Sequence, residues 1–115
     1  TYEASRIGNC QYSDMTVFSF HPVKIITTAE GGMVTTQNQQ LAERLHLYRS
    51  HWITRDSANM QGDSHGDWYY QQIDLGYNYR ITDLQCALGT SQMKRIDTFL
   101  TRRREIAAIY GFRYY

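Results

Sequence analysis

The only proline of the chain, Pro22, ends a short run that is rich in aromatic and β-branched residues. The run covers residues 14–20, Asp-Met-Thr-Val-Phe-Ser-Phe, and this composition is typical of a buried strand. Proline has no amide hydrogen to donate to a neighbouring strand, so the strand is expected to end there. Lys24 is therefore predicted to lie on a turn just beyond the carboxyl end of a strand.

The next stretch predicts a turn, a strand and a helix. Residues 30–32, Glu-Gly-Gly, are typical of a turn, and residues 33–36 predict a second short strand. Residues 39–51 carry Leu41, Leu45 and Tyr48 at helical spacing. The first half of the chain is therefore predicted to contain both strands and a helix.

The second half predicts a long loop followed by two helices. Residues 52–72 show no periodicity and are rich in Gly, Asp and Ser, which predicts a long loop. Loops of this length are uncommon inside a compact domain and often carry function. Thr82 and Gln85 match a capping box that opens a helix, and residues 94–111 predict another helix. The combination of strands and helices indicates an α/β class.

The helix that begins near Thr82 has an expected inner face. Its predicted inner stripe consists of Leu84, Ala87, Leu88 and Ser91. The small residues along this helix, which include Gly89, would permit close helix packing.

Composition excludes several function classes. The net charge is +1, with 12 Lys and Arg against 11 Asp and Glu, which indicates neither a nucleic-acid nor a membrane surface. No apolar run approaches the roughly 20 residues that span a bilayer. Cys10 and Cys86 form no metal motif, and none of the four histidines has a partner at ligand spacing, so we expect no metal site. Nothing in the sequence indicates a disulfide between the two cysteines or rules one out, and a reducing cytoplasm is the default expectation because two thiols can stay unpaired there.

The segment from Ser19 to Lys24 is the strongest candidate for chemistry. Ligands usually bind at the mouth of an α/β sheet, and a lysine there can act as a nucleophile toward an aldehyde. Ser19 could offer a hydroxyl to a phosphate, and His21 could stack on a ligand or donate a hydrogen bond. The alternative is a strand that ends in a merely solvated lysine.

A second candidate stands just before the predicted helix at Thr82. Asn78 and Arg80 could meet an anion there. The alternative is a capped helix start with packed tyrosines.

Several segments together resemble one family, the DegT/DnrJ/EryC1/StrS sugar aminotransferases. Residues 18–24 and 27–32 resemble its cofactor-lysine segment. Further similar segments follow in family order, and the resemblance covers essentially the whole chain: residues 49–51 (Arg-Ser-His), 76–83 (Gly-Tyr-Asn-Tyr-Arg-Ile-Thr-Asp), 85–89, 91–92 and 102–107.

The resemblance implies a fold. It is the large domain of a fold-type I transferase that depends on pyridoxal 5'-phosphate (PLP), similar to aspartate aminotransferase. We expect the chain to be a fragment that lacks both ends, because it has no initiator methionine, begins within a polar stretch and stops immediately after a strongly helical segment. Residues 1–93 are expected to form the C-terminal part of the PLP-binding domain, and residues 94–115 a long helix that leads toward a small domain.

The resemblance also implies residue roles. Lys24 would form the Schiff base with PLP and carry protons, and Ser19 would bind the cofactor phosphate. Asn78 would reach the phosphate in the partner subunit of a homodimer. His21 and Arg80 are expected to contact substrate, Arg80 within a site that both subunits share.

The implied reaction is transamination of a nucleotide-linked 4-keto-6-deoxy sugar to the 4-amino sugar, with glutamate as amino donor. Residues 19–32 are especially similar to the branch that forms a UDP-linked 4-amino-4,6-dideoxy altrosamine, a precursor of pseudaminic acid. Perosamine-type and bacillosamine-type enzymes share the same motifs. Sugar dehydratases of this fold carry histidine in place of the lysine, and a non-catalytic regulatory member would not need Lys24.

The chain departs from the family pattern at Trp52, where glycine is usual, so the loop after His51 is expected to differ in shape. Three further parts of the family site are expected outside these residues: the aspartate that holds the pyridine nitrogen, the phosphate loop and the aromatic residue that stacks on the ring. The chain alone is therefore expected to be inactive.

Overall fold

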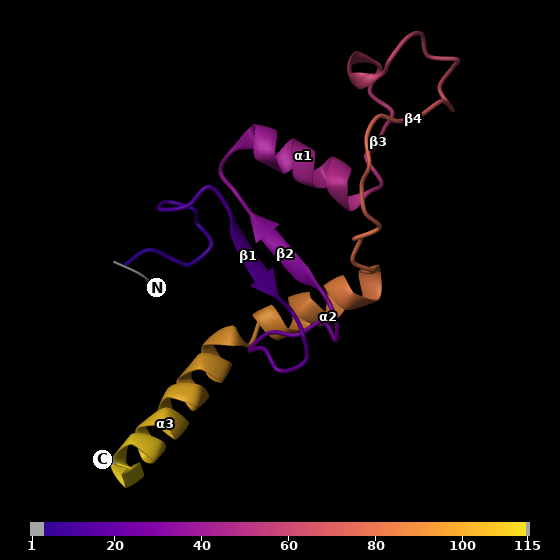
Figure 1. The fold of residues 1–115 in the computed structure, drawn as a ribbon. Coiled ribbons are helices and arrows are strands. Elements are labelled where there is room, and N and C mark those ends of the chain that lie inside the picture. The colour runs from indigo at the N-terminus through magenta and orange to yellow at the C-terminus, as the bar shows by residue number, and fades with distance from the viewer. Residues whose placement is uncertain (1–3, 115) are drawn as a thin grey trace. The chain divides into compact units, whose positions relative to one another are not determined.

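The computed structural model describes residues 4–114, with side chains for residues 4–111 (Figure 1). Its described residues divide into two compact units, which comprise residues 4–16 with 34–80 and residues 17–33 with 81–114. The elements follow in the order β1 (Thr16–Ser19), β2 (Gly32–Thr35), α1 (Gln39–Arg49), β3 (Ile53–Thr54), a 3-10 turn (Ser57–Asn59), β4 (Gln71–Gln72), α2 (Asp83–Met93) and α3 (Ile96–Tyr114).

Strands β1 and β2 form a two-stranded sheet, and their arrows run in opposite directions in Figure 1. Both predicted strands are confirmed, but β2 begins at Gly32 rather than at residue 33. A Cβ on Gly32 would lie 2.8 Å from the carbonyl oxygen of Phe18, so the strands approach each other where Gly32 has no side chain. Gly32 therefore belongs to the strand and not to the turn before it.

Helix α1 begins where it was predicted and ends earlier. The side chain of Asn38 accepts hydrogen bonds from the amides of Gln40 and Leu41, which caps the first turn. The helix stops at Arg49 because His51 and Trp52 adopt left-handed backbone conformations, with φ of 61° and 54°.

The predicted loop at residues 52–72 contains structure that the sequence did not indicate. Strands β3 and β4 pair antiparallel, with Ile53 opposite Gln72. The side chain of Gln71 also binds both backbone groups of Gln61, at 2.8 and 2.9 Å. Strands of two residues have no alternation to detect, which is why the prediction of an unstructured loop was wrong here.

Helix α2 confirms the capping box, since Thr82 Oγ1 accepts from the amide of Gln85 and the Gln85 side chain accepts from the amide of Thr82. The predicted inner stripe is wrong: Leu84 is 85% exposed, and the rest of the stripe is exposed as well. The less exposed face carries Gln85, Gly89 and Gln92. Gln85 and Gln92 contact polar backbone groups of the loop between β1 and β2. The apolar stripe lies on another face of α2 and stays uncovered.

The described side chains build almost no apolar core. Among residues 4–111, Ile26 is the only apolar side chain that is buried, and Thr28 and Thr54 are the buried polar ones. The prediction that β1 is buried is wrong, because Val17 is 76% exposed on a sheet of two strands. Within the described residues, no helix has both the length and the apolar character to cross a membrane, and no group of three His, Cys, Asp or Glu side chains could hold a metal ion.

Candidate functional site

Lys24 lies on the turn between β1 and β2, as predicted. The turn is closed by a hydrogen bond of 3.0 Å from the amide of Lys24 to the carbonyl of His21. The side chain is exposed, and its amine makes no hydrogen bond or ion pair with any described residue. Because no described side chain competes for it, the amine is accessible to a ligand such as an aldehyde.

Ser19 and His21 lie beside this turn on the same stretch of chain. Ser19 Oγ accepts a 3.4 Å hydrogen bond from the amide of His21, so its own hydroxyl hydrogen remains available to a ligand. His21 Nδ1 accepts a 3.4 Å bond from the amide of Val23. In the neutral ring, that bond leaves the hydrogen on Nε2, which can donate outward.

The loop that carries Lys24 is closed at its base by hydrogen bonds to Phe20. The carbonyl of Phe20 accepts from Thr27 Oγ1 at 2.9 Å and from the amide of Thr28 at 3.0 Å. Thr28 is 2% exposed, and its hydroxyl donates to the carbonyl of Glu30 at 2.8 Å. A Cβ on Gly31 would lie 2.5 Å from Thr28 Oγ1, and φ of Gly31 is +152°, so this position requires glycine.

Helix α2 contacts the same loop through three residues. Gln92 Oε1 accepts a 2.9 Å hydrogen bond from the amide of Thr27. Gln85 Nε2 donates to the carbonyl of Glu30 at 2.8 Å. Between them lies Gly89, where a Cβ would come within 2.9 Å of Thr28 Cγ2.

From the sequence, Gln85 is predicted only as a capping residue and Gln92 only as part of a motif. The contacts of both residues with the loop are found in the structure alone. A signal was present, because residues 85, 89 and 92 are spaced to share one helix face, and two amides on one face can bind a neighbouring backbone.

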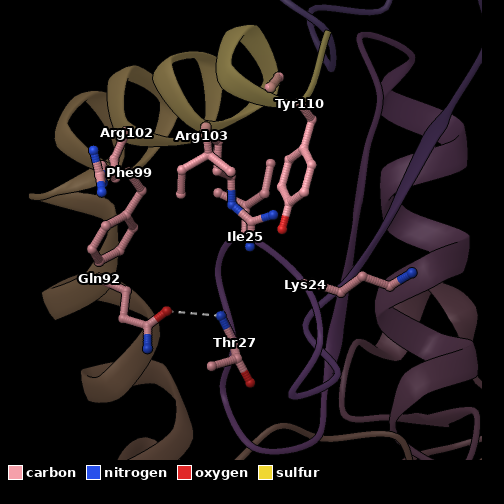
Figure 2. A pocket seen from close by; sticks show the side chains of 10 residues that line it. Lys24, Ile25, Thr27, Gln92, Phe99, Arg102, Arg103 and Tyr110 are labelled. Carbon is pink, nitrogen blue, oxygen red and sulfur yellow. Dashed lines mark hydrogen bonds between the residues drawn. The ribbon is translucent and has the colours of Figure 1, made fainter. Parts of the chain in front are cut away.

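A groove of about 680 Å³ separates the loop from α3 (Figure 2). Arg103 and Tyr110 extend from α3 toward Ile25, whereas the Lys24 side chain extends away from these α3 residues in this view. Arg102 forms an exposed ion pair of 2.9 Å with Glu105. The groove residues are Lys24, Ile25, Thr27, Gln92, Phe99, Arg102, Arg103, Ile106, Ala107 and Tyr110.

Asn78 and Arg80 are brought together by a direct contact. Asn78 Oδ1 accepts from Arg80 Nε at 3.1 Å and from Nη2 at 3.0 Å. This leaves both hydrogens of the Asn78 amide nitrogen free to donate, beside a guanidinium charge. Such a pair of side chains suits an anion such as a phosphate.

The segment around Asn78 runs beside the end of α1. Ser50 and Asn78 form an antiparallel bridge, and the amide of Tyr79 donates to the carbonyl of Arg49 at 3.0 Å. Two motifs that are about 25 residues apart are therefore neighbours. Ser19, His21 and Lys24 belong to the other structural unit.

The donor set matches what PLP requires from a protein. Lys24 supplies an amine without a partner, while Ser19 and Asn78 supply neutral hydrogen-bond donors that suit a phosphate. In this arrangement these groups would bind and orient PLP, and the cofactor itself would act as the electron sink.

Comparison with known proteins gives one consistent result. Residues 1–112 match the sequence model of the DegT/DnrJ/EryC1/StrS aminotransferase family. A UDP-4-amino-4,6-dideoxy-N-acetyl-beta-L-altrosamine transaminase of Campylobacter jejuni is 41% identical over 109 residues, which are 95% of this chain and 26% of that protein.

Solved structures agree with the sequence match. PseC of Helicobacter pylori, an aminotransferase involved in the biosynthesis of pseudoaminic acid, superposes with a TM-score of 0.82 at 34% identity, over 96% of this chain and 27% of PseC. Spr1654 of Streptococcus pneumoniae, solved in its PLP form, gives a TM-score of 0.78 at 29% identity, over 96% of this chain and 26% of its own.

The chain therefore has part of the α/β fold of PLP aminotransferases, as predicted, and it spans about a quarter of the length of these relatives. The expected family is confirmed across nearly every residue. This chain belongs to the DegT/DnrJ/EryC1/StrS aminotransferase family.

Proposed function

We propose that the protein to which this chain belongs is a PLP-dependent aminotransferase that converts a nucleotide-linked 4-keto-6-deoxy sugar to the 4-amino sugar, with glutamate as amino donor. The observation that carries the proposal is Lys24, an unpaired lysine on a tight turn at a strand end, inside a family of aminotransferases. The similarity to the altrosamine transaminase of C. jejuni supports a UDP-linked sugar of the pseudaminic acid type.

Each candidate residue has a proposed task. PLP supplies the electron sink for moving an amino group. Lys24 Nζ holds the cofactor covalently and moves a proton at the reacting carbon, while Ser19 Oγ donates to the cofactor phosphate. His21 contacts substrate through its outward ring nitrogen.

Asn78 and Arg80 form the second part of the proposed site. The Asn78 amide nitrogen donates to the cofactor phosphate of the partner subunit in a homodimer, and Arg80 holds the amide in that orientation. Arg80 also lines the sugar site. Residues 1–93 would belong to the PLP-binding domain and residues 94–115 to the helix toward a small domain, in a cytoplasmic enzyme.

Other functions would require different residues. A dehydratase of this fold would carry histidine at position 24, and Lys24 favours transamination over that class. Perosamine-type and bacillosamine-type transamination stay as alternatives for the sugar. The test is an assay of the full-length protein against a panel of nucleotide-linked 4-keto sugars with glutamate; turnover of none of them would contradict the proposal.

A mixing experiment tests the role of Asn78 across a dimer. Loss of a hydrogen bond to a charged group costs about 1.5–3 kcal/mol, so Asn78→Ala should weaken cofactor affinity roughly ten- to a hundredfold. Lys24→Ala should be inactive. If each site uses Lys24 of one subunit and Asn78 of the other, a hybrid dimer of the two variants has one intact site.

At random equal mixing, half of the dimers are hybrid, so activity should recover toward about a quarter of wild type. Subunit exchange is followed independently with two affinity tags. Exchange without any recovery of activity would show that Asn78 serves its own subunit, because each hybrid site would then carry one lesion.

A further inference from the structure

Two glutamines on α2 bind opposite kinds of backbone group on the Lys24 loop. Gln92 accepts the amide hydrogen of Thr27 at 2.9 Å, and Gln85 donates to the carbonyl of Glu30 at 2.8 Å. The loop partners determine which end of each side-chain amide faces the loop, because a backbone amide can only donate and a carbonyl can only accept.

The two contacts act from one surface of the helix. Residues 85, 89 and 92 share a face, and Gly89 lets the helix approach until its missing Cβ would lie 2.9 Å from Thr28 Cγ2. Thr28, in turn, is nearly inaccessible to solvent. The loop is thus held at Thr27 and Glu30 by hydrogen bonds and at Thr28 by close packing.

We propose that Gln85 and Gln92 are positioning residues that set the placement of Lys24 for attachment of the cofactor. The inference rests on the proposed function of Lys24. Lys24 is three residues from Thr27, and its own long side chain has no partner among the described residues, so its placement depends on the backbone of the loop. A misplacement of about 1 Å at a reacting group can cost roughly a hundredfold in rate.

Replacing each glutamine by glutamate separates the two contacts. Gln92→Glu keeps an oxygen that accepts from Thr27, so it should behave like wild type. Gln85→Glu keeps the oxygen of the capping box but replaces the donor to Glu30 by a second oxygen, so the contact with the carbonyl of Glu30 should be lost. Gln92→Leu removes the acceptor, so the contact with the amide of Thr27 should be lost as well. Gln40→Glu and Gln40→Leu, at an exposed position of α1, are the matched controls.

The first readout uses the full-length apoprotein. Hydrogen exchange of the peptide that covers residues 20–31 should accelerate roughly two- to tenfold in Gln92→Leu and in Gln85→Glu, with wild-type rates in Gln92→Glu and in both controls. The second readout is the rate at which added PLP becomes trapped on Lys24 by borohydride, which should fall about tenfold in the same two variants and recover in Gln92→Glu.

Equal effects of Gln92→Glu and Gln92→Leu, or wild-type exchange and trapping in Gln85→Glu, would overturn the inference. Faster exchange with an unchanged trapping rate would also overturn it, because the glutamines would then stabilise the loop without positioning Lys24. Trapping of PLP on another lysine is a different result, since it overturns the proposed function of Lys24 itself.

Discussion

Gly76 is the residue at which the described backbone leaves the least room. A Cβ there would lie 2.4 Å from the amide nitrogen of Trp52 and 2.5 Å from the carbonyl carbon of His51. The backbone at these two residues is already in the left-handed region, where glycine is favoured. The ring of Trp52 at this turn packs edge-on against Tyr48, with centroids 4.1 Å apart.

Gly76→Ala is therefore expected to destabilise the full-length protein by about 2 kcal/mol or more, because backbone atoms must move to admit the methyl group. The measurement is the free energy of unfolding in urea. Gly111→Ala is the control, since no described atom beyond its chain neighbours and the helix's own backbone lies within 4 Å of a Cβ at that position on helix α3. It should be neutral or stabilise by up to roughly 1 kcal/mol. Equal effects of the two substitutions would contradict the close approach at Gly76.

The start of helix α2 is determined by its local sequence. In its capping box, the side chains of Thr82 and Gln85 each accept a hydrogen bond from the other residue's amide. The negative charge of Asp83 in the first turn interacts favourably with the positive N-terminal end of the helix dipole. The start of α2 also places Gln85 against the carbonyl of Glu30. The cap therefore contributes both to the helix and to its contact with the loop.

Thr82→Ala should cost about 1 kcal/mol of stability in the full-length protein, because it removes the acceptor for the amide of Gln85. Thr82→Ser keeps that hydroxyl and should restore most of the loss. The comparison is made by thermal unfolding, and similar melting temperatures for Thr82→Ala and wild type would show that the cap is not needed.

Local signals explain which elements could be predicted from the sequence. Pro22 predicted the end of β1 and the turn of Lys24, and the capping box predicted the start of α2, because each depends on neighbouring residues. The pairing of β3 with β4 and the bridge between Ser50 and Asn78 depend on residues far apart in the sequence.

The inner face of α2 was mispredicted for a related reason. The apolar stripe indicated burial, but the described contacts are made by two glutamines and a glycine, whose partners are backbone groups of the loop. Sequence periodicity reports where apolar residues lie, and it carries no information about hydrogen bonds to a distant backbone. The turn that carries Lys24 is therefore predictable from neighbouring residues. The shared helix face of Gln85 and Gln92 is also visible in the sequence, but the backbone groups that they bind are not.

The described surface is rich in uncovered apolar side chains. Leu84 on α2, Val17 on β1 and Leu75 beyond β4 are all more than three-quarters exposed. The chain also spans only about a quarter of the length of its relatives. Leucine and valine are among the residue types most often buried in folded proteins.

The isolated 115-residue chain is accordingly expected to be marginally stable and prone to aggregate, with open sheet edges at β1 and β2. Size-exclusion chromatography and calorimetry test this expectation. A monodisperse monomer with a sharp, cooperative melting transition would contradict it.

The most direct test of the proposed function is to trap PLP on the full-length protein with borohydride and to locate the modified residue by mass spectrometry. The chain has two lysines, and Lys94 at the end of α2 serves as the internal control. The prediction is that the cofactor mass appears on the peptide that contains Lys24, that Lys24→Ala abolishes the labelling, and that Lys94→Ala leaves it unchanged. Cofactor trapped on any other lysine of the protein, or undiminished labelling of Lys24→Ala, would contradict the assignment of Lys24.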